Sequence, residues 1–437
     1  MGVGYDEKTA GSKAVPAEGQ VGSAPEASGT ACRFCGQLLS RTVVDLGMSP
    51  LCESFVAAED LDRREVFYPL NVRICEHCFL VQLPEYVAPE EIFTEYAYFS
   101  SYSDSFVQHA RDYVDMAVER FGLGPSSLVV EIASNDGYLL QHFVERRVPV
   151  LGIEPAENVA AAARERDVPT QVAFFGVELA RELVAERGAA DLVIGNNVLS
   201  QAPHLNDFVG GIRILLAADG TATIEFPHLM RLLEANLFDT IYHEHFTYFS
   251  LRTAERVFAA HGLTVFDLEE VETHGGSLRL YIRHEQDDSR PVSEAVERFR
   301  QREESAGLES FQPYAEFRGR IEEAKRALLQ FLIEARRAGK SVACYGAPGK
   351  ANTLLNYCGI RTDLVDYVVD RNPYKHGRYT PGTHIPIHPP ERIAETKPDY
   401  VWILPWNLKD EIVEQLAYVR EWGGRLLVAV PELTLLP

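Results

Sequence analysis

The segment between residues 128 and 154 constrains the fold of this chain more than any other part of the sequence. Leu128–Ile132 is an apolar run typical of a buried strand, and the small and polar residues 134–137 follow it as a sharp turn. Tyr138–Glu145 has the pattern of a helix, and Val148–Ile153 is a second apolar strand. Strand, turn, helix and strand in this order predict half of a βαβ unit that binds a nucleotide.

The polar residues of this unit indicate which nucleotide it binds. An acidic residue at the second strand tip can accept hydrogen bonds from both ribose hydroxyls. The turn lacks the G-x-G-x-x-G pattern that accommodates a pyrophosphate, which argues against a dinucleotide. An acidic end to the first strand, followed by Asn-Asp-Gly, favours a cationic adenosyl ligand, S-adenosylmethionine. Alternatively, the turn only connects strand and helix. The predicted cofactor-binding residues here are Glu131, Ser134, Asn135, Asp136, Gly137 and Glu154.

Length and charge restrict the classes of protein that this chain can represent. Its 437 residues, 46% of them hydrophobic, predict two or three folded domains. The formal net charge of -22 opposes binding to nucleic acid or to anionic membranes. No segment has the length and apolarity of a transmembrane helix, and residues 1–30 are rich in Gly, Ala, Ser and Pro, which predicts a disordered tail rather than a signal peptide. An odd number of cysteines, seven, without an export signal predicts a cytoplasmic protein.

The order of predicted elements indicates an α/β protein with several parts after the tail. Residues 31–83 are Cys-rich, residues 84–284 begin with helices and then alternate strand and helix, residues 285–339 form a charged helical linker, and residues 340–437 form a second Rossmann-like α/β unit. A parallel sheet that ends in an antiparallel pair predicts a Rossmann-like methyltransferase domain for residues 84–284. The predicted strands are 128–132, 148–153, 191–195, 221–226, 264–271 and 277–283, then 341–345, 364–369, 399–404 and 425–430.

Two C-x-x-C motifs predict a metal site in the Cys-rich part. Cys32 and Cys35 form the first motif, and Cys75 and Cys78 form the second. Each motif can place two thiolates on one tetrahedral ion, so the pair predicts a closed, structural zinc site without an open position for catalysis. The alternatives are two disulfides, which a reducing compartment disfavours, or four buried free thiols.

Residues near other strand tips of the first α/β unit are further candidates for the cofactor pocket. Asn196 follows the predicted strand 191–195, and the tips of parallel strands line the ligand crevice of such a sheet. Its alternative role is a plain turn. Phe174 and Phe175 precede a glycine, and an aromatic ring there can stack on adenine or simply pack in the core.

The densest polar cluster of the chain is Tyr242-His243-Glu244-His245. Apolar and aromatic neighbours argue against full exposure, and a half-buried His beside an acid is a candidate general base. The alternatives are a solvated loop or a metal site, although consecutive residues rarely converge on one ion. His274 precedes two glycines and the strand 277–283, where it either closes the same pocket or belongs to a simple hairpin turn.

The second α/β unit carries a turn that resembles a phosphate-binding loop. Residues 344–350 join a strand to a helix through Gly346-Ala347-Pro348-Gly349-Lys350, without the full spacing of a Walker A motif. A helix N-terminus with free amides can hold a diphosphate, whereas the alternative is an ordinary glycine turn. Arg371 and Asn407 follow two later strands and should face the same crevice.

Taken together, these motifs resemble the zinc-containing, S-adenosylmethionine-dependent sugar C-methyltransferases of deoxysugar biosynthesis, and especially the C-3′-methyltransferase type of the tetronitrose pathway. The resemblance extends over about residues 31–431. The matching segments are the two C-x-x-C motifs, 45–47, 81–83, 96–101, 131–137, 238–246, 274–276 and 345–347.

The resemblance implies a zinc domain, a central cofactor domain and a C-terminal domain that helps to hold a nucleotide sugar, usually a dTDP-linked 4-keto-6-deoxysugar. It implies active-site roles for Tyr242, Glu244 and His245, and for a tyrosine ahead of the central domain. Tyr98 is the best match for that tyrosine, with Tyr96 and Tyr102 as rivals. The residues implied or predicted to bind the substrate are Gln201, His274, Tyr345, Lys350, Arg371 and Asn407.

One position departs from the family pattern. Related sequences commonly carry an active-site His where this chain has Gln201, and Gln does not carry a proton at neutral pH. From the resemblance we expect C-methylation of the ketosugar at C-3, in which His245 generates an enolate and Glu244 orients its imidazole or balances the imidazolium. The Gln201 departure keeps other reactions open. The alternatives are another carbon such as C-5, another acceptor, or a binding protein with an inactive methyltransferase core.

Overall fold

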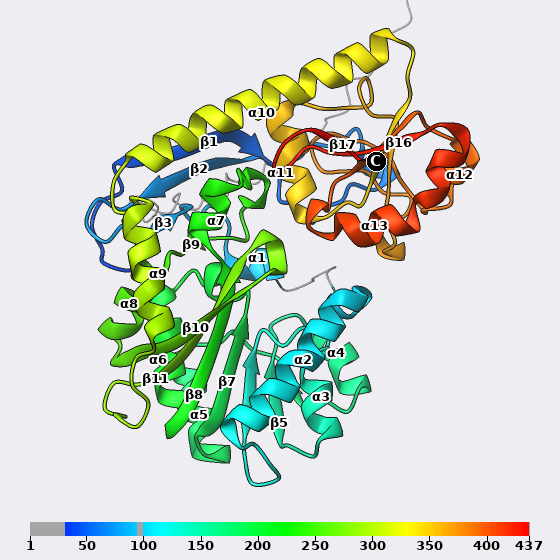
Figure 1. The fold of residues 1–437 in the computed structure, drawn as a ribbon. Helices are drawn as coiled ribbons and strands as arrows, with labels where there is room; N and C mark the ends of the chain where they lie inside the picture. The colour runs from blue at the N-terminus through cyan, green and yellow to red at the C-terminus, as the bar shows by residue number, and fades with distance from the viewer. Residues whose placement is uncertain (1–30, 94–98, 437) are drawn as a thin grey trace, which may run out of the picture.

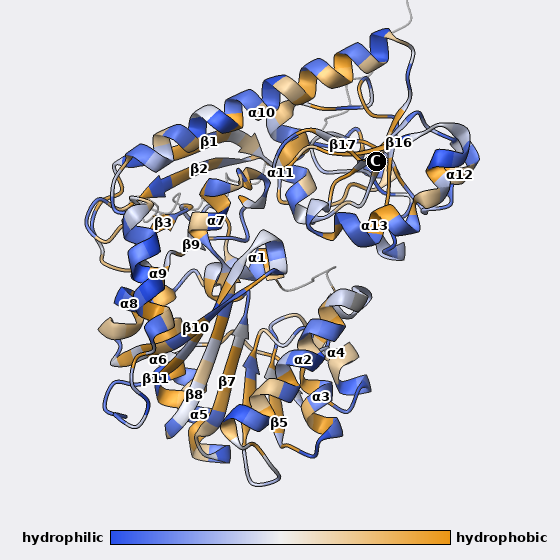
Figure 2. Cartoon of the chain, viewed as in Figure 1, coloured by the Kyte–Doolittle hydropathy of each residue, from blue (hydrophilic) through white to orange (hydrophobic). Residues whose placement is uncertain are grey.

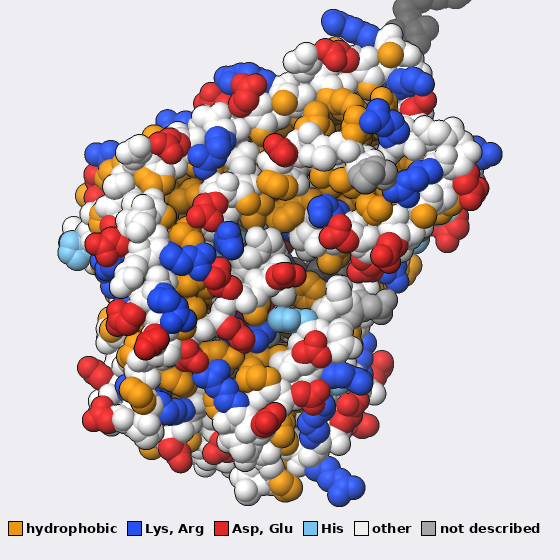
Figure 3. Space-filling view, viewed as in Figure 1, with side chains coloured by type: hydrophobic (Ala, Val, Ile, Leu, Met, Phe, Trp, Pro, Cys, Tyr) orange, Lys and Arg blue, Asp and Glu red, His pale blue; other side chains and the backbone are white. Residues whose placement is uncertain are grey.

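Three β-sheets and the helices around them make up the computed structural model, which describes residues 31–93 and 99–436. Figure 1 shows the central sheet below, the N-terminal sheet and the C-terminal unit above it, and the long helix α10 (Gln312–Arg337) along the top. Among the helices that the structure describes, none combines the length and apolarity needed to span a membrane. Acidic and basic side chains are interspersed on the face shown in Figure 3.

The N-terminal sheet has a strand from a distant part of the chain. Its order is β1-β2-β3-β9, and all neighbours are antiparallel. The last strand pairs Tyr248 with Val81 and Thr247 with Gln82. The segment directly after the predicted catalytic cluster is therefore attached to the Cys-rich part. The strands are β1 (Arg41–Ser49), β2 (Tyr68–Ile74), β3 (Val81–Gln82) and β9 (Thr247–Tyr248).

The central sheet has the strand order β10-β11-β8-β7-β4-β5-β6. Its strands are parallel except β11, which is antiparallel to both of its neighbours. This arrangement confirms the predicted Rossmann-like methyltransferase sheet. The strands are β4 (Val129–Ile132), β5 (Val150–Ile153), β6 (Thr170–Gln171), β7 (Ala190–Asn196), β8 (Leu216–Pro227), β10 (Leu263–Val271) and β11 (Ser277–His284).

Helices cover both faces of the central sheet, and their amphipathic pattern explains why. In Figure 2 the strands are mostly apolar, whereas the helices alternate apolar and hydrophilic stretches around their axes. Helix α2 begins after Ser103, whose hydroxyl accepts a hydrogen bond from the Phe106 amide, and ends at Gly122 in the left-handed conformation. The helices are α2 (Asp104–Phe121), α3 (Leu140–Glu145), α4 (Glu157–Glu165), α5 (Val177–Arg187), α6 (Leu205–Leu215) and α8 (Leu251–Ala260).

The C-terminal unit contains a second sheet of related topology, in the order β14-β13-β12-β15-β16-β17. All neighbours are parallel except β16 and β17. Its strands are β12 (Val342–Tyr345), β13 (Tyr367–Val369), β14 (Ile387–His388), β15 (Tyr400–Ile403), β16 (Arg425–Val428) and β17 (Thr434–Leu436), and its helices are α11 (Gly349–Cys358), α12 (Arg392–Thr396) and α13 (Lys409–Gln415).

The predicted charged linker consists of two helices, α9 (Glu294–Ser305) and α10. Helix α10 buries Phe317, Ile321, Leu328 and Leu332 on one side, a spacing of four, seven and four residues that keeps them on one face. This face contacts β1 and the short helix α7 (Leu229–Glu234), so the linker ties the N-terminal sheet to the other parts.

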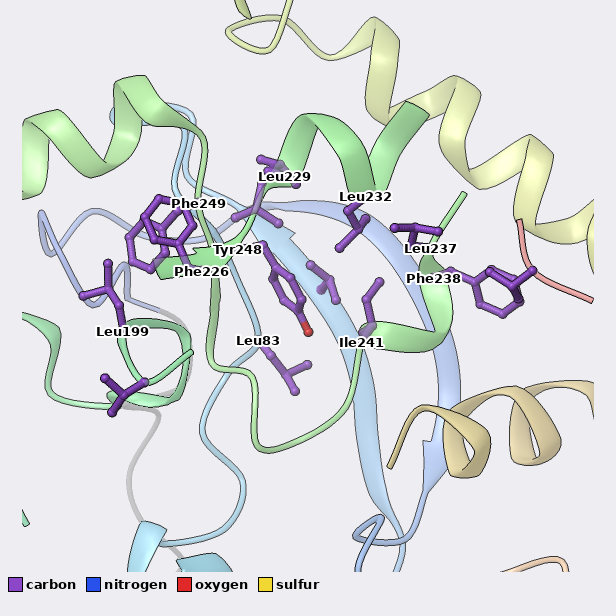
Figure 4. Close-up of a cluster of buried hydrophobic side chains, with 14 of the residues drawn as sticks. Leu83, Leu199, Phe226, Leu229, Leu232, Leu237, Phe238, Ile241, Tyr248 and Phe249 are labelled. Atoms are coloured by element: carbon purple, nitrogen blue, oxygen red, sulfur yellow. The ribbon is translucent and has the colours of Figure 1, made fainter. Parts of the chain in front are cut away.

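A buried hydrophobic cluster supports the segment that carries the predicted catalytic residues. Figure 4 shows this cluster, which gathers side chains from β8, α7, β9 and the loops between them, together with Leu83 after β3 and Leu199 after β7. Because these side chains pack on both sides of the polar segment 242–246, its backbone is held between the N-terminal and central sheets. The labelled members are Leu83, Leu199, Phe226, Leu229, Leu232, Leu237, Phe238, Ile241, Tyr248 and Phe249.

Candidate active site

A single cavity of about 1240 Å³ receives the strand tips of both α/β units. From the central sheet it is lined by Asn135, Glu154 and Asn196, and from the C-terminal sheet by Tyr345 and Asn407. The carboxyl ends of parallel strands therefore meet at this cavity from two sides, as the strand-tip rule predicts. The predicted site residues that line it are Asn135, Glu154, Phe174, Asn196, Gln201, Tyr242, Glu244, His245, His274, Tyr345, Lys350, Arg371 and Asn407.

The ends of β4 and β7 and the turn after β4 carry several oxygen atoms without hydrogen-bond partners. These atoms are buried, and none has a partner among the described residues. Each can accept a hydrogen bond, so these strand ends fit a ligand that brings donors and positive charge, as an adenosyl sulfonium with its ammonium group does. They are Glu131 Oε2, Ser134 Oγ, Asp136 Oδ1, Asn196 Oδ1 and Asn197 Oδ1.

Four of the predicted cofactor residues lie behind the cavity wall rather than on it. Glu131, Ser134, Asp136 and Gly137 are buried and do not line the cavity. Gly137 has a φ of +76°, and a Cβ atom there would lie 3.0 Å from Val168 Cγ2. We conclude that this glycine shapes the turn, a role that differs from the ligand contact expected from the sequence.

Glu154 closes the same turn at the tip of β5. Its carboxylate accepts hydrogen bonds from the amides of Asn135 and Ala156, both at 3.0 Å. Burial raises the pKa of Glu154 to about 7 against the opposing effect of these amides. Burial, together with Glu154 and Asp136, also raises the pKa of Glu131 well above its usual value. A cationic ligand in this place would favour the charged form of both carboxyls.

The two neighbouring phenylalanines after β6 have different surroundings. Phe174 lines the cavity with 44% of its surface exposed, whereas Phe175 packs edge-on against Phe208 at a centroid distance of 5.6 Å. Both rings line the cavity, but Phe174 is the more exposed of the two and so the better candidate to stack on a nucleobase, because Phe175 also packs on Phe208.

His245 is held in the geometry of a neutral base. Its Nδ1 donates a hydrogen bond to the carbonyl oxygen of Thr240 at 2.8 Å, which leaves Nε2 as the nitrogen that can accept a proton. Burial, with a smaller effect of the Lys350 ammonium, lowers the pKa of His245 to about 4. The Tyr242 ring lies against the imidazole at a centroid distance of 4.1 Å.

Glu244 does not accept the hydrogen bond from His245 Nδ1. The Thr240 carbonyl holds the imidazole instead, and Glu244 accepts a hydrogen bond from Cys52 Sγ at 3.0 Å. A backbone carbonyl can reach Nδ1 because Thr240 ends a short 3-10 helix five residues before the histidine. His243 points elsewhere, since its Nε2 contacts the Pro69 carbonyl at 3.2 Å.

Gln201 and His274 are further predicted residues that line the cavity. Gln201 ends the 3-10 helix Leu199–Gln201, and His274 lies in the left-handed region with a φ of +54°, its ring edge-on to Phe106. Burial lowers the pKa of His274 to about 3, so this imidazole is neutral. Tyr98 and its rival Tyr96 lie outside the described residues, whereas the rival Tyr102 lines the cavity.

Cations line the opposite wall, but one amide of the predicted phosphate turn is already bonded. The Ala347 amide donates to Asp370 Oδ2 at 2.7 Å. Lys350 is buried above the Trp406 ring, and its Nζ donates to Asn407 Oδ1 at 2.7 Å. Arg371 lines the cavity with its side chain half-exposed. Tyr345 donates its hydroxyl hydrogen to Gln415 Oε1 at 3.0 Å. Lys350 and Arg371 offer positive charge to an anionic ligand, although Asp370 and Glu411 also line the cavity and Arg371 pairs with Glu411 at 3.8 Å.

The four predicted zinc ligands converge on one point. Their sulfur atoms lie within 4.8 Å of one another, with Cys32 3.6 Å from Cys78 and Cys35 3.5 Å from Cys75. Sulfurs about 2.3 Å from one tetrahedral ion lie about 3.8 Å apart, so the set fits one zinc ion. The short contacts join the two motifs, which excludes a separate disulfide within each motif.

Fold and site together define a methyltransferase that uses S-adenosylmethionine and holds a structural zinc. Three family models match in succession: a putative zinc-binding domain over residues 32–93, a methyltransferase domain over 106–268, and a C-methyltransferase C-terminal domain over 272–431. C-methyltransferase NovU from Streptomyces niveus is 37% identical over 401 residues, which cover 92% of this chain and 95% of NovU. The chain therefore belongs to this family of C-methyltransferases and is an enzyme.

Solved structures are similar to part of the chain. Magnesium protoporphyrin IX methyltransferase from Synechocystis PCC 6803, with bound SAH, is 16% identical, covers 40% of this chain and 83% of its own, and has a TM-score of 0.33. The PH0226 protein from Pyrococcus horikoshii OT3 is 16% identical, covers 45% of this chain and 97% of its own, and has a TM-score of 0.36.

Proposed function

We propose that this enzyme methylates a carbon beside the ketone of a dTDP-linked 4-keto-6-deoxysugar, at C-3, in natural-product deoxysugar biosynthesis. The observation that carries the proposal is the neutral imidazole of His245, fixed through Nδ1 in a cavity with an acceptor-rich wall and a cationic wall. At about 1240 Å³ the cavity exceeds the usual range of a site for one small ligand, about 300–1,000 Å³, so it has room for a cofactor and a second molecule.

The ketone determines which step the protein must assist. A carbonyl acidifies the adjacent C–H bond, and His245 Nε2 would remove that proton, a contribution of about 10²–10⁴-fold. Tyr242 would donate a hydrogen bond to the oxygen where enolate charge develops, with Tyr98 as a second predicted donor. The bound cofactor supplies the methyl group to the carbanionic carbon. The enzyme's remaining task is to hold the two ligands in contact and in line.

The cationic wall would take the nucleotide part of the substrate. Lys350 and Arg371 offer positive charge to a diphosphate, and Asn407 and Tyr345 lie beside them. A diphosphate would bind Lys350 by charge and hydrogen bonding, in place of the Ala347 amide that Asp370 occupies. The acceptor-rich wall, with Phe174 for the adenine, would take the cofactor.

The direct test is methylation of a panel of dTDP-ketosugars by the purified enzyme with S-adenosylmethionine. Mass spectrometry should detect one added methyl group on a 4-keto-6-deoxysugar, and NMR should locate it at C-3. Binding of the ketosugars without turnover on any of them would contradict the proposal.

The role of His245 is tested by hydrogen exchange in D₂O. We expect His245→Asn to slow exchange of the substrate C–H next to the ketone by about 10²–10⁴-fold, because Asn cannot accept the proton. His261→Asn is the matched control, since His261 does not line the cavity. Exchange at the wild-type rate in His245→Asn would remove this residue as the base.

A second candidate position is C-5, which flanks the same ketone on its other side. Gln201 favours it, because related sequences commonly carry an imidazole at this position and this chain has an amide, which does not carry a proton at neutral pH. NMR of the product distinguishes a methyl group at C-5 from one at C-3.

A further inference from the structure

Glu53, a residue of the N-terminal part, reaches the same cavity as the predicted catalytic residues. It lies in the loop after β1 and lines the cavity together with Tyr242, Glu244 and His245. Its neighbour Cys52 is buried and donates its thiol hydrogen to Glu244 at 3.0 Å. The zinc-containing part therefore supplies side chains to the site beyond its role as a support.

The Glu53 carboxyl lies beside other carboxyls, and one of its two oxygens is buried without a hydrogen bond. Its Oε2 has no hydrogen-bond partner among the described residues. The nearest ammonium, Lys375 Nζ, lies 3.7 Å away and donates instead to the Ala347 carbonyl at 2.9 Å. Oε2 of Glu53 therefore keeps a hydrogen-bonding capacity that the described residues do not use.

The charges that face Glu53 are predominantly negative. Glu244 and Asp370 are carboxyls that act on it, and the Lys375 ammonium opposes them. Burial, with the repulsion of Glu244 and Asp370, raises the pKa of Glu53 to about 7 despite Lys375. Three carboxyls around one lysine are better accommodated when one of them retains a proton.

We infer that Glu53 acts in its protonated form and donates a hydrogen bond from its carboxyl to an oxygen of the bound ketosugar. No bond to carbon forms or breaks at Glu53, and the proton stays on the carboxyl. This inference rests on the proposed function, because a ketosugar has the carbonyl and hydroxyl oxygens that such a donor needs. A protonated carboxyl in an apolar site is an established way to stabilise an enolate oxygen.

Two substitutions separate a proton donor from a negative charge. Glu53→Gln keeps the shape and supplies an N–H donor without charge, so kcat/KM at pH 7 should stay within about threefold of wild type. Glu53→Ala removes the donor and should lower kcat/KM about tenfold, the scale of one hydrogen bond. Glu59→Gln, an exposed glutamate of the same segment, is the matched control. Equal loss in Glu53→Gln and Glu53→Ala would overturn the inference.

The pH profile gives a readout that a purely structural role would not change. Wild-type kcat/KM should fall as the pH rises through about 7, because the donor form of Glu53 is lost above its pKa. In Glu53→Gln this descending limb should disappear, since an amide does not titrate. A limb that persists unchanged in Glu53→Gln belongs to another group and contradicts the inference.

Infrared spectroscopy tests the protonated carboxyl without any turnover. The wild-type protein below pH 7 should show a carbonyl stretch of a protonated carboxyl that is missing in Glu53→Gln. If no such band exists, the inference fails even where the ketosugar is methylated. If the band exists and no ketosugar is methylated, the proposed function fails and the donor role toward a ketosugar fails with it. Zinc content and thermal melting of each variant identify those that do not fold.

Discussion

The central sheet and the C-terminal sheet share a strand order at their middle, yet they present opposite chemistry to one cavity. In each sheet the first strand lies between the second and the fourth, as β4 lies between β5 and β7 and β12 lies between β13 and β15. The central turn leaves acceptors such as Ser134 Oγ without partners. In the C-terminal turn, Asp370 binds the Ala347 amide and Lys350 supplies a cation. The ligand is therefore determined by the residues at the strand tips, whereas the topology determines only where the ligands meet.

The largest effect is expected from the acidic tip of the central sheet. Glu154→Ala should weaken binding of S-adenosylmethionine about 100-fold, because the ribose loses its acceptor and the amides of Asn135 and Ala156 lose theirs. Isothermal calorimetry measures this Kd, and Glu157→Ala, an exposed neighbour, is the control. If the two sheets are as different as we infer, the KM for the nucleotide sugar should change little.

A smaller effect is expected from the cation of the C-terminal sheet. Lys350→Met should raise the KM for the nucleotide sugar about tenfold, since a charge-assisted hydrogen bond to the diphosphate is lost while the length of the side chain is kept. The Kd of S-adenosylmethionine should not change. Because the Lys350 ammonium helps to lower the pKa of His245, the acid limb of kcat/KM should also move to higher pH. A change in cofactor Kd instead would reverse the assignment of the two walls.

The smallest effect is expected at the exposed edge of the cationic wall. Arg371→Ala should raise the KM for the nucleotide sugar about two- to threefold, because solvent screens a half-exposed guanidinium. Raising the salt concentration should reduce this difference. Lys409→Ala, which does not line the cavity, is the control. An effect of Arg371→Ala as large as that of Lys350→Met would indicate that the diphosphate lies further out.

Strong periodic patterns made most of the fold predictable from the sequence. The strand predicted at 128–132 begins one residue later in the structure, and the strand predicted at 277–283 extends by one residue. The short strands β6, β9, β14 and β17 were not predicted, because two or three residues carry no periodicity and their pairing depends on distant partners. The six-residue helix α7 was not predicted either.

The site was predictable where a motif carried the chemistry, and not where the fold supplied a partner. The zinc ligands follow from spacing alone, and His245 follows from its polar cluster. The Thr240 carbonyl that holds His245 has no sequence signal, because any residue offers a carbonyl. Glu53 was not predicted as a site residue for a related reason. It follows a strand of another sheet, and only tertiary packing brings it beside Glu244 and Lys375.

The strand β9 has a consequence for how the parts of this protein depend on one another. Thr247 and Tyr248 complete the sheet of the metal-binding part, two residues after the proposed base. The metal-binding part is thus not an independent addition to the enzyme. Its removal would take away strand β3, the pairing partner of β9, and with it one of the contacts that hold His245 in place. A shortened enzyme built around the central sheet must therefore retain the N-terminal sheet.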